Sequence, residues 1–120
     1  MPKKILIIDD EEGVRESLKL ILGDRYNLIL TDNGPQGLEC LAKSRDISLV
    51  LLDIKMPRMN GFDILKEIHG KYPDVKVVMI TGYRSVETAA EAVRLGATGY
   101  IVKPFKSEEI LNCVNKNLEQ

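Results

Sequence analysis

The sequence predicts an α/β fold: a five-stranded parallel sheet, doubly wound, with helices on both faces. Short apolar runs alternate with amphipathic stretches from one end of the chain to the other. The runs are almost continuously apolar, which is typical of strands buried on both faces. Right-handed crossovers leave few topologies for five β-α units, and an open doubly wound sheet, in which the first and third strands can be neighbours, is the first choice.

The five strands are predicted from runs that are rich in β-branched residues and bounded by Asp, Gly, Asn or Pro. In chain order they are residues 4–8, 28–30, 49–52, 75–80 and 100–102. Each run is followed by a stretch in which apolar residues recur every three or four positions, as on one face of a helix. These apolar positions are Val14, Leu18, Ile21 and Leu22; Leu38 and Leu41; Phe62, Leu65 and Ile68; Val86, Ala89, Ala90 and Val93; and Ile110, Val114 and Leu118.

Length and composition predict a single domain over residues 1–120. The hydrophobic fraction of 44% suffices for a core, and 17 basic against 18 acidic residues give a net charge of −1. This balance argues against direct nucleic-acid binding, and no apolar run approaches the roughly 20 residues of a membrane span. Cys40 and Cys113 lie far apart in helical patterns, as expected for reduced thiols. We therefore expect a cytoplasmic protein.

Polar residues follow the predicted strands at the edge where doubly wound sheets bind their ligands. Asp9 and Asp10 follow the first strand, Asp53 the third, Thr81 the fourth and Lys103 the fifth. Each has an ordinary explanation when taken singly: a helix cap, a turn residue, a β-branched strand residue or a solvated lysine. The combination carries the functional prediction.

Three carboxylates gathered at one edge need a compensating cation, because two of them about 4 Å apart repel by about 4 kcal/mol at an effective dielectric constant near 20. Carboxylate oxygens favour a hard divalent ion, above all Mg²⁺. A metal ion, the Lys103 ammonium and the Thr81 hydroxyl around Asp53 would suit a phosphoryl group. They can stabilise the charge on its oxygens while the carboxylate attacks phosphorus.

Four motifs in this order resemble the receiver domain of bacterial two-component response regulators. They are IIDD at residues 7–10, LLDIKMP at 51–57, MITG at 79–82 and GYIVKPF at 99–105. Each motif is weak by itself, but the four at these spacings are highly specific. The resemblance extends from residue 4 to about residue 118, and it implies the flavodoxin-like strand order 2-1-3-4-5.

The resemblance implies a role for each residue of the site. Asp53 would be the phosphoacceptor. Asp10 and Asp53 would bind Mg²⁺ together with the backbone carbonyl of Lys55, and Asp9 would act through water. The resemblance also implies that Lys103 pairs with a phosphoryl oxygen and that the Lys103–Pro104 peptide bond is cis.

The resemblance likewise implies the switch. Thr81 would donate its hydroxyl to the phosphoryl group and move inward, and the Tyr100 ring would follow. Asn60-Gly61 stands where the family often has Asp-Gly, and either pair can form that turn. Lys55 and Tyr83 occupy variable positions that tune the lifetime of the phosphate in this family.

The implied function is a phosphorylation-activated signalling switch, with only its own phosphoryl transfer and slow autodephosphorylation as activity. The donor would be a sensor histidine kinase or a phosphotransfer protein, and the output an effector domain or protein, including transcriptional regulators. The output face would comprise the fourth helix, fifth strand and fifth helix. A homodimer that forms through this face is also compatible with the family. Its exposed candidates are Arg84, Glu87, Glu91, Arg94, Lys106 and Glu108.

Three alternatives remain at this point. A haloacid-dehalogenase-like phosphatase needs an acid two residues after its nucleophile, where this chain has Lys55. A flavodoxin-like or nucleotide-binding module needs a phosphate-cradling loop after the first strand, where this chain has four acids. An unphosphorylated receiver-like interaction module would not need the five site residues Asp9, Asp10, Asp53, Thr81 and Lys103. His69 is expected to be a solvated residue near a helix end rather than a ligand.

Overall fold

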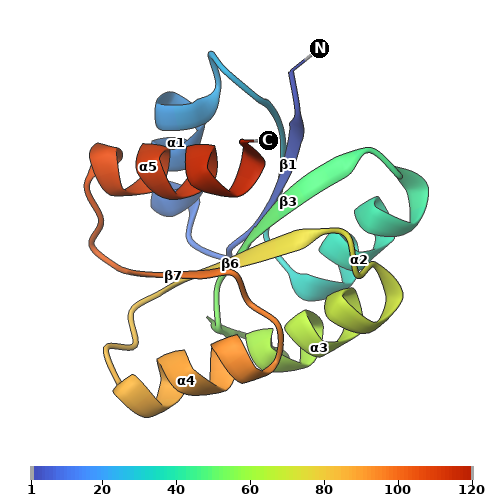
Figure 1. Ribbon diagram of the computed structural model, residues 1–120, viewed down its shortest axis with the longest axis vertical. Helices are drawn as coiled ribbons and strands as arrows, with labels where there is room; N and C mark the ends of the chain where they lie inside the picture. Colours follow the sequence, from blue (N-terminus) through green and yellow to red (C-terminus); the bar gives the residue numbers. More distant parts are fainter. Residues whose placement is uncertain (1, 120) are drawn as a thin grey trace.

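The computed structural model describes residues 2–119 and contains the predicted five-stranded parallel sheet (Figure 1). Its strands are β1 (Lys4–Ile8), β2 (Asn27–Thr31), β3 (Ile47–Leu52), β6 (Lys76–Thr81) and β7 (Gly99–Val102). They lie in the order β2-β1-β3-β6-β7, and all neighbouring pairs are parallel. Once the small hairpin β4-β5 is set aside, this is the predicted order 2-1-3-4-5.

Five helices cover the two faces of the sheet, with α1 and α5 on one face and α2, α3 and α4 on the other (Figure 1). They are α1 (Glu12–Leu22), α2 (Gly34–Lys43), α3 (Gly61–Lys71), α4 (Val86–Arg94) and α5 (Ser107–Leu118). Within residues 2–119, no helix has the length and apolar character needed to cross a membrane.

The strands alternate their side chains between two cores. In β1, Leu6 and Ile8 pack with α2 and α3, whereas Ile5 and Ile7 pack with α1 and α5. All four side chains are fully buried. Burial of each such side chain contributes about 1.5–3 kcal/mol, so the central strands are held firmly and their carboxyl ends form a rigid platform.

A two-stranded antiparallel hairpin that the sequence did not predict follows β3. It consists of β4 (Lys55–Met56) and β5 (Met59–Asn60), joined through Pro57 and Arg58. Arg58 has a φ of 71°, a conformation that usually favours glycine. Two-residue strands are too short to show an alternating pattern, and the Arg at the turn hides the turn signal.

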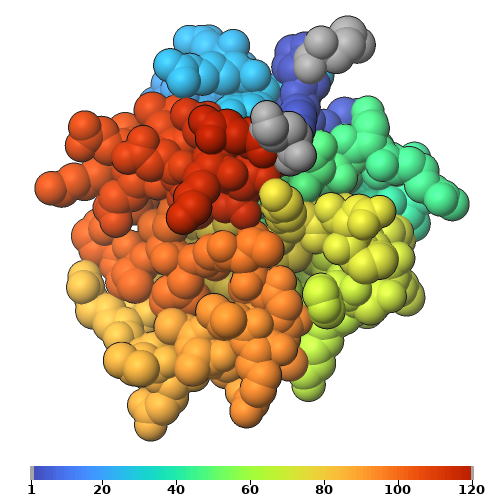
Figure 2. Space-filling view, viewed as in Figure 1, coloured from blue at the N-terminus to red at the C-terminus, as the bar shows by residue number. Residues whose placement is uncertain are grey.

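The predicted apolar face of α4 is wrong. Val86 and Val93 are 82% and 63% exposed, and Ala90 is also exposed. The fully buried residue of α4 is Ala92. Alanine occupies three of the nine positions of α4, so packing area differs little between its faces and the two valines did not identify the buried side. The exposed surface of α4 lies along the lower edge of the molecule, with β7 and α5 above it in the same view (Figure 2).

Polar bonds tie the C-terminal end of α5 to the edge of the sheet remote from the carboxyl ends of the strands. Lys3 and Lys76 donate to the carbonyls of Leu118 and Asn117 at 3.0 and 2.7 Å. The Thr98 hydroxyl donates to the Asn117 side-chain carbonyl at 2.6 Å. The two lysine bonds satisfy backbone carbonyls that the end of a helix leaves without partners, and the lysine charges suit the negative end of the helix dipole.

Candidate functional site

The predicted acids come together at the carboxyl ends of the neighbouring strands β1 and β3, the topological switch point of the sheet. The Asp9 N–H donates to the carbonyl of Thr31 at 3.1 Å, and the Asp53 N–H donates to the carbonyl of Ile8 at 3.0 Å. Sheet pairing therefore continues one residue past β1 and β3 and holds both aspartates at neighbouring strand ends. Asp9, Asp10 and Asp53 each offer a carboxylate oxygen within 4.8 Å of the others. Asp9 and Asp53 are buried and Asp10 is exposed.

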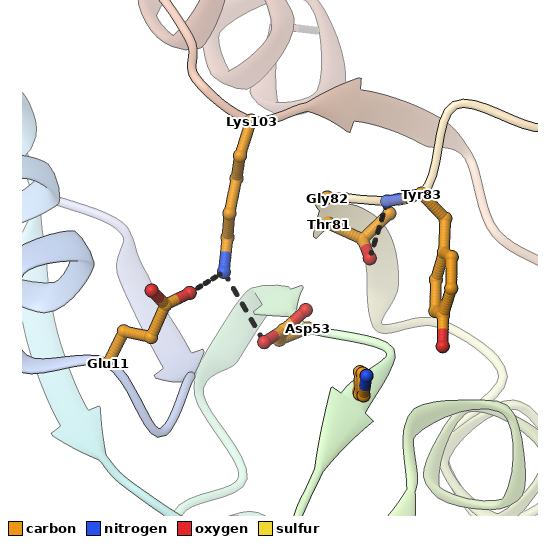
Figure 3. A pocket seen from close by; sticks show the side chains of 7 residues that line it. Glu11, Asp53, Thr81, Gly82, Tyr83 and Lys103 are labelled. Atoms are coloured by element: carbon orange, nitrogen blue, oxygen red, sulfur yellow. Dashed lines mark hydrogen bonds and ion pairs between the residues drawn. The ribbon is translucent and has the colours of Figure 1, made fainter.

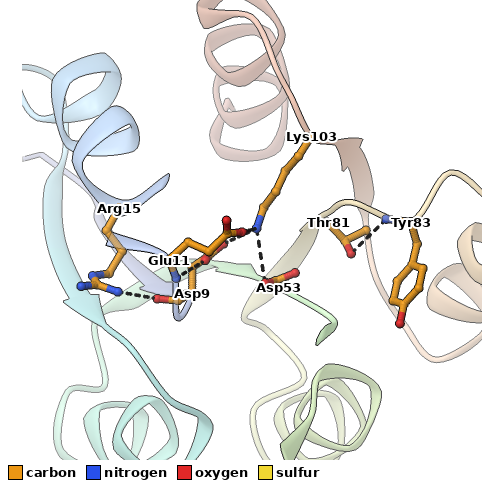
Figure 4. Close-up of polar contacts among 7 residues, drawn as sticks. All are labelled: Asp9, Glu11, Arg15, Asp53, Thr81, Tyr83 and Lys103. Atoms are coloured by element: carbon orange, nitrogen blue, oxygen red, sulfur yellow. Dashed lines mark hydrogen bonds and ion pairs between the residues drawn. The ribbon is translucent and has the colours of Figure 1, made fainter. Parts of the chain in front are cut away.

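Lys103 reaches over this acidic cluster from the end of β7 (Figures 3 and 4). Its ammonium lies 2.7 Å from Glu11 Oε1, 3.0 Å from Asp9 Oδ2 and 3.3 Å from Asp53 Oδ2. Its backbone N–H donates to the carbonyl of Thr81 at 2.8 Å, which aligns the end of β7 with the end of β6. The peptide bond between Lys103 and Pro104 is cis, as the resemblance implied.

Burial and mutual contacts shift the pKa values of Asp9, Asp53 and Lys103. Burial raises the pKa of Asp9 to about 6, against the opposing hydrogen bonds from the Glu11 N–H and Lys103. Burial also raises the pKa of Asp53, although the charge of Lys103 acts to lower it. Burial acts to lower the pKa of Lys103 itself, but contacts with Glu11 and Asp9 outweigh it and raise that pKa. The Lys103 ammonium thus offsets only part of the cost of burying the Asp9 and Asp53 carboxylates.

The acidic cluster fits a divalent cation. It offers hard carboxylate oxygens from three residues in mutual reach, and zinc-preferring thiolates and imidazoles do not contribute to it. Burial has already made two of these acids costly to ionise, so a cation would offset that cost. Lys55, whose carbonyl the resemblance implied as a third ligand, is exposed and follows Asp53 by two residues.

An open cavity of about 320 Å³ lies beside Asp53. Its walls come from the ends of four strands and the loops that follow them, and Figure 3 shows the side chains that line it. The lining residues are Glu11, Asp53, Lys55, Thr81, Gly82, Tyr83 and Lys103. Asp53 and Lys103 meet in its wall, so a small anionic group that entered would contact the carboxylate and the ammonium together.

Thr81 and Tyr100 are linked through Tyr83. The Tyr83 N–H donates to Thr81 Oγ1 at 3.4 Å, and the Tyr100 hydroxyl donates to the Tyr83 carbonyl at 2.9 Å. Thr81 is buried at the cavity and Tyr83 is exposed at its rim. The sequence singled out Tyr83 only as a variable position, whereas in the structure its backbone connects Thr81 to Tyr100.

The junction between β5 and α3 lies against the loop that carries Asp53. The Asn60 side chain accepts a hydrogen bond from the Phe62 N–H at 2.7 Å and so caps α3. A Cβ on Gly61 would lie 2.3 Å from the carbonyl oxygen of Asp53, so the close approach requires glycine. Asn60-Gly61 therefore forms the junction between β5 and α3 and holds the start of α3 close to the Asp53 loop.

Sequence reasoning missed Glu11 as a site residue. It had grouped Glu11 with the acids after the first strand, but the spacing gave no sign that the side chain contacts Lys103, 92 positions along the chain. Arg15 was also missed: its guanidinium donates to the carbonyl of Asp9 at 2.9 Å (Figure 4).

His69 is exposed near the end of α3, as expected. Five of the six output-face candidates are exposed; Glu91 is half-buried and pairs with Arg94.

The fold and this site define a doubly wound α/β domain with a carboxylate–lysine centre at the switch point of its sheet. Comparison with known proteins identifies the family. The response regulator receiver domain matches residues 5–115. The chain therefore belongs to the receiver domains of two-component response regulators, which act as phosphorylation-activated signalling switches.

Several relatives illustrate the range of the family. The chain is 37% identical over 119 residues to sporulation initiation phosphotransferase F of Bacillus subtilis, with 98% of this chain and 95% of that protein covered. It is 36% identical to response regulator protein FleR of Pseudomonas aeruginosa, with 98% of this chain but 25% of FleR covered. The chain thus spans about a quarter of the length of FleR and of the regulatory protein AtoC of Escherichia coli.

Solved structures agree with this assignment. A CheY-like receiver domain protein from Methanospirillum hungatei superimposes with a TM-score of 0.93 at 32% identity, covering 99% of this chain and 95% of that one. NtrX from Brucella abortus, solved in complex with ADP, superimposes with a TM-score of 0.92 at 34% identity, covering 99% of this chain and 27% of that one.

Proposed function

We propose that Asp53 is the phosphoacceptor of this receiver domain. A carboxylate oxygen of Asp53 attacks phosphorus, a P–O bond forms, and the P–N bond to the donor histidine breaks as its imidazole leaves. The observation that carries the proposal is the position of Asp53: a buried carboxylate in the wall of an open cavity, 3.3 Å from the ammonium of Lys103.

Mg²⁺ is the cofactor that the donor set fits. Asp10 and Asp53 would hold it through carboxylate oxygens and Lys55 through its backbone carbonyl, with Asp9 acting through water. When bound, the ion offsets the charge of the acids and of the phosphoryl oxygens. This assignment is supported by the carboxylate oxygens of Asp9, Asp10 and Asp53, which lie within 4.8 Å of one another.

Lys103 and Thr81 would recognise the phosphoryl group once it is attached. Phosphorylation brings roughly −2 charge and new acceptor oxygens to Asp53. Lys103 pairs with one oxygen and the Thr81 hydroxyl donates to another. Because Thr81 is linked to Tyr100 through the backbone of Tyr83, movement of Thr81 changes the setting of the Tyr100 ring. This differential interaction shifts the domain between two conformations.

Residues 1–120 would act as one receiver domain in the cytoplasm. The partner that supplies phosphate is a sensor histidine kinase or a phosphotransfer protein. The face formed by α4, β7 and α5 contacts the output domain or protein, or a second copy of the chain. The domain is a switch rather than a turnover enzyme, and its activity is limited to its own phosphoryl transfer and slow dephosphorylation.

Intact-mass measurement with a small phosphodonor tests the proposal. The protein should gain one phosphoryl group in the presence of Mg²⁺ and none in the presence of a chelator. Asp53→Asn should abolish the gain, whereas Asp24→Asn, at an exposed aspartate outside the site, should retain it. Incorporation that persists in Asp53→Asn would place the acceptor elsewhere, and none in the unaltered protein would favour an interaction-only module.

A further inference from the structure

Glu11 occupies the N-cap position of α1, yet its side chain does not cap the helix. Its backbone is extended, with φ −91° and ψ 117°, and within residues 2–119 its carboxylate accepts no hydrogen bond from the first turn. Ser, Thr, Asp and Asn are the residues that usually fill this role, because their side chains are short enough to reach those N–H groups. The Glu11 carboxylate instead extends away from the helix to Lys103 (Figure 4).

The contact between Glu11 and Lys103 is the shortest of the three that the ammonium makes. The distances are 2.7 Å to Glu11, 3.0 Å to Asp9 and 3.3 Å to Asp53. The ammonium donates hydrogen bonds to Glu11 and Asp53 and forms an ion pair with Asp9. A phosphoryl oxygen on Asp53 must therefore draw the ammonium away from the carboxylates of Glu11 and Asp9 to pair with it fully.

Glu11 is the partner that can give up its donor at least cost. Its side chain is 60% exposed, whereas that of Asp9 is 3% exposed. A released Glu11 carboxylate is hydrated at once, but a released Asp9 carboxylate would stay buried without a full set of partners.

We infer that Glu11 is a positioning residue that holds Lys103 in the unphosphorylated site and yields it to the phosphoryl oxygen when Asp53 is modified. This inference rests on the proposed role of Asp53. Because the Glu11–Lys103 contact is stronger in the unphosphorylated state, it stabilises that state and opposes the phosphorylated one. Glu11 thereby sets how readily the domain is activated.

Beryllofluoride is a suitable probe, since a BeF3-activated receiver domain is among the solved structural relatives. Its dissociation constant is measured by titration calorimetry at saturating Mg²⁺ for the unaltered protein, Glu11→Gln, Glu11→Asp and Glu12→Gln. Glu11→Gln removes the charge. Glu11→Asp keeps the charge but shortens the side chain by one methylene, so the contact with Lys103 is lost. Glu12→Gln removes the same charge from the adjacent exposed residue.

Both Glu11 variants should bind beryllofluoride roughly two- to fivefold more tightly, as expected for loss of a partly exposed ion pair. Glu12→Gln should bind like the unaltered protein. The inference is wrong if Glu11→Asp has the dissociation constant of the unaltered protein while Glu11→Gln and Glu12→Gln share the same altered one. The change would then come from loss of a negative charge near the site and not from the contact between Glu11 and Lys103. Unchanged or weaker binding in both Glu11 variants would overturn it as well.

Thermal unfolding separates positioning from a structural role. Asp is a better N-cap residue than Glu, so Glu11→Asp should unfold at the same or a higher temperature while its beryllofluoride affinity changes. The proposed function fails separately: if the unaltered protein does not bind beryllofluoride, or if Asp53→Asn binds it equally well, both ideas are overturned. Normal Asp53-dependent binding with unaltered Glu11 variants overturns only the inference.

Discussion

Gly61→Ala should damage both the stability of the domain and its metal site. The new Cβ would lie 2.3 Å from the Asp53 carbonyl oxygen and 2.6 Å from Ile54 Cα, where real Cβ contacts are essentially never under 3.0 Å. These are backbone atoms of a buried loop, so no side-chain rotation relieves the contact. Overpacking of this kind costs about 1–3 kcal/mol. The 2.7 Å hydrogen bond from the Gly61 N–H to the Ile54 carbonyl is also weakened, at about 1 kcal/mol.

Together these terms predict a loss of roughly 2–4 kcal/mol in the free energy of unfolding, or about 4 °C in Tm per kcal/mol for a domain of this size. Urea unfolding followed by circular dichroism measures it. The displaced backbone also carries Asp53 and leads to Lys55, so the Mg²⁺ affinity of Gly61→Ala, measured by calorimetry, should fall as well.

Gly70→Ala is the matched control on the same helix. A Cβ on Gly70 meets no atom within 4 Å, and alanine is favoured over glycine in helices by up to about 1 kcal/mol. Gly70→Ala should therefore unfold at the same or a higher urea concentration, with unchanged Mg²⁺ affinity. If the two variants unfold together, the close approach of α3 to the Asp53 loop does not constrain the site as described.

Further predictions concern single side chains. In chelator at pH 7, Asp9→Asn should stabilise the protein by about 1–3 kcal/mol, because burial raises the pKa of Asp9 to about 6 and its ionised form is costly. Between about pH 4 and pH 6, Asp9 binds more protons in the folded protein than in the unfolded chain, so folding becomes less costly as the pH falls. The gain in the free energy of unfolding that Asp9→Asn brings, measured by urea unfolding, should therefore be smaller at pH 5 than at pH 7. An equal gain at both pH values would contradict the buried Asp9 carboxylate as its cause. Thr81→Ala should still accept a phosphoryl group, by intact mass, but beryllofluoride should shift the ring signals of Tyr100 less in NMR spectra than in the unaltered protein. Burial raises the pKa of Cys113, so a disulfide reagent at pH 8 should modify it far more slowly in the folded protein than in urea; equal rates would refute the burial.

The strands and the meeting of Asp9, Asp53 and Lys103 at one edge of the sheet could be predicted because their signals are local. Runs such as residues 4–8 are apolar throughout, and Asp9, Asp53 and Lys103 stand directly after strands whose parallel arrangement brings them to one edge. The predicted order of the strands was enough to place these residues together without any knowledge of side-chain geometry.

The features that could not be predicted depend on tertiary contacts. The contact of Glu11 with Lys103 requires the segment that follows β7 to lie beside the start of α1, which no spacing encodes. The buried side of α4 is decided by which small residue fits the sheet, and Ala92 carries a weaker hydrophobic signal than Val86 or Val93. The hairpin after β3 is too short for a pattern.

The polar bonds at the end of α5 limit how that helix can move. Lys3, Lys76 and Thr98 fix the last turn of the helix to strand β6, to the loop before β7 and to the start of the chain. The other end of the helix begins at Ser107, just beyond Lys103 and the acidic cluster. Any displacement of α5 that keeps these bonds is a rotation about its last turn, so its largest movement falls at the end next to the site.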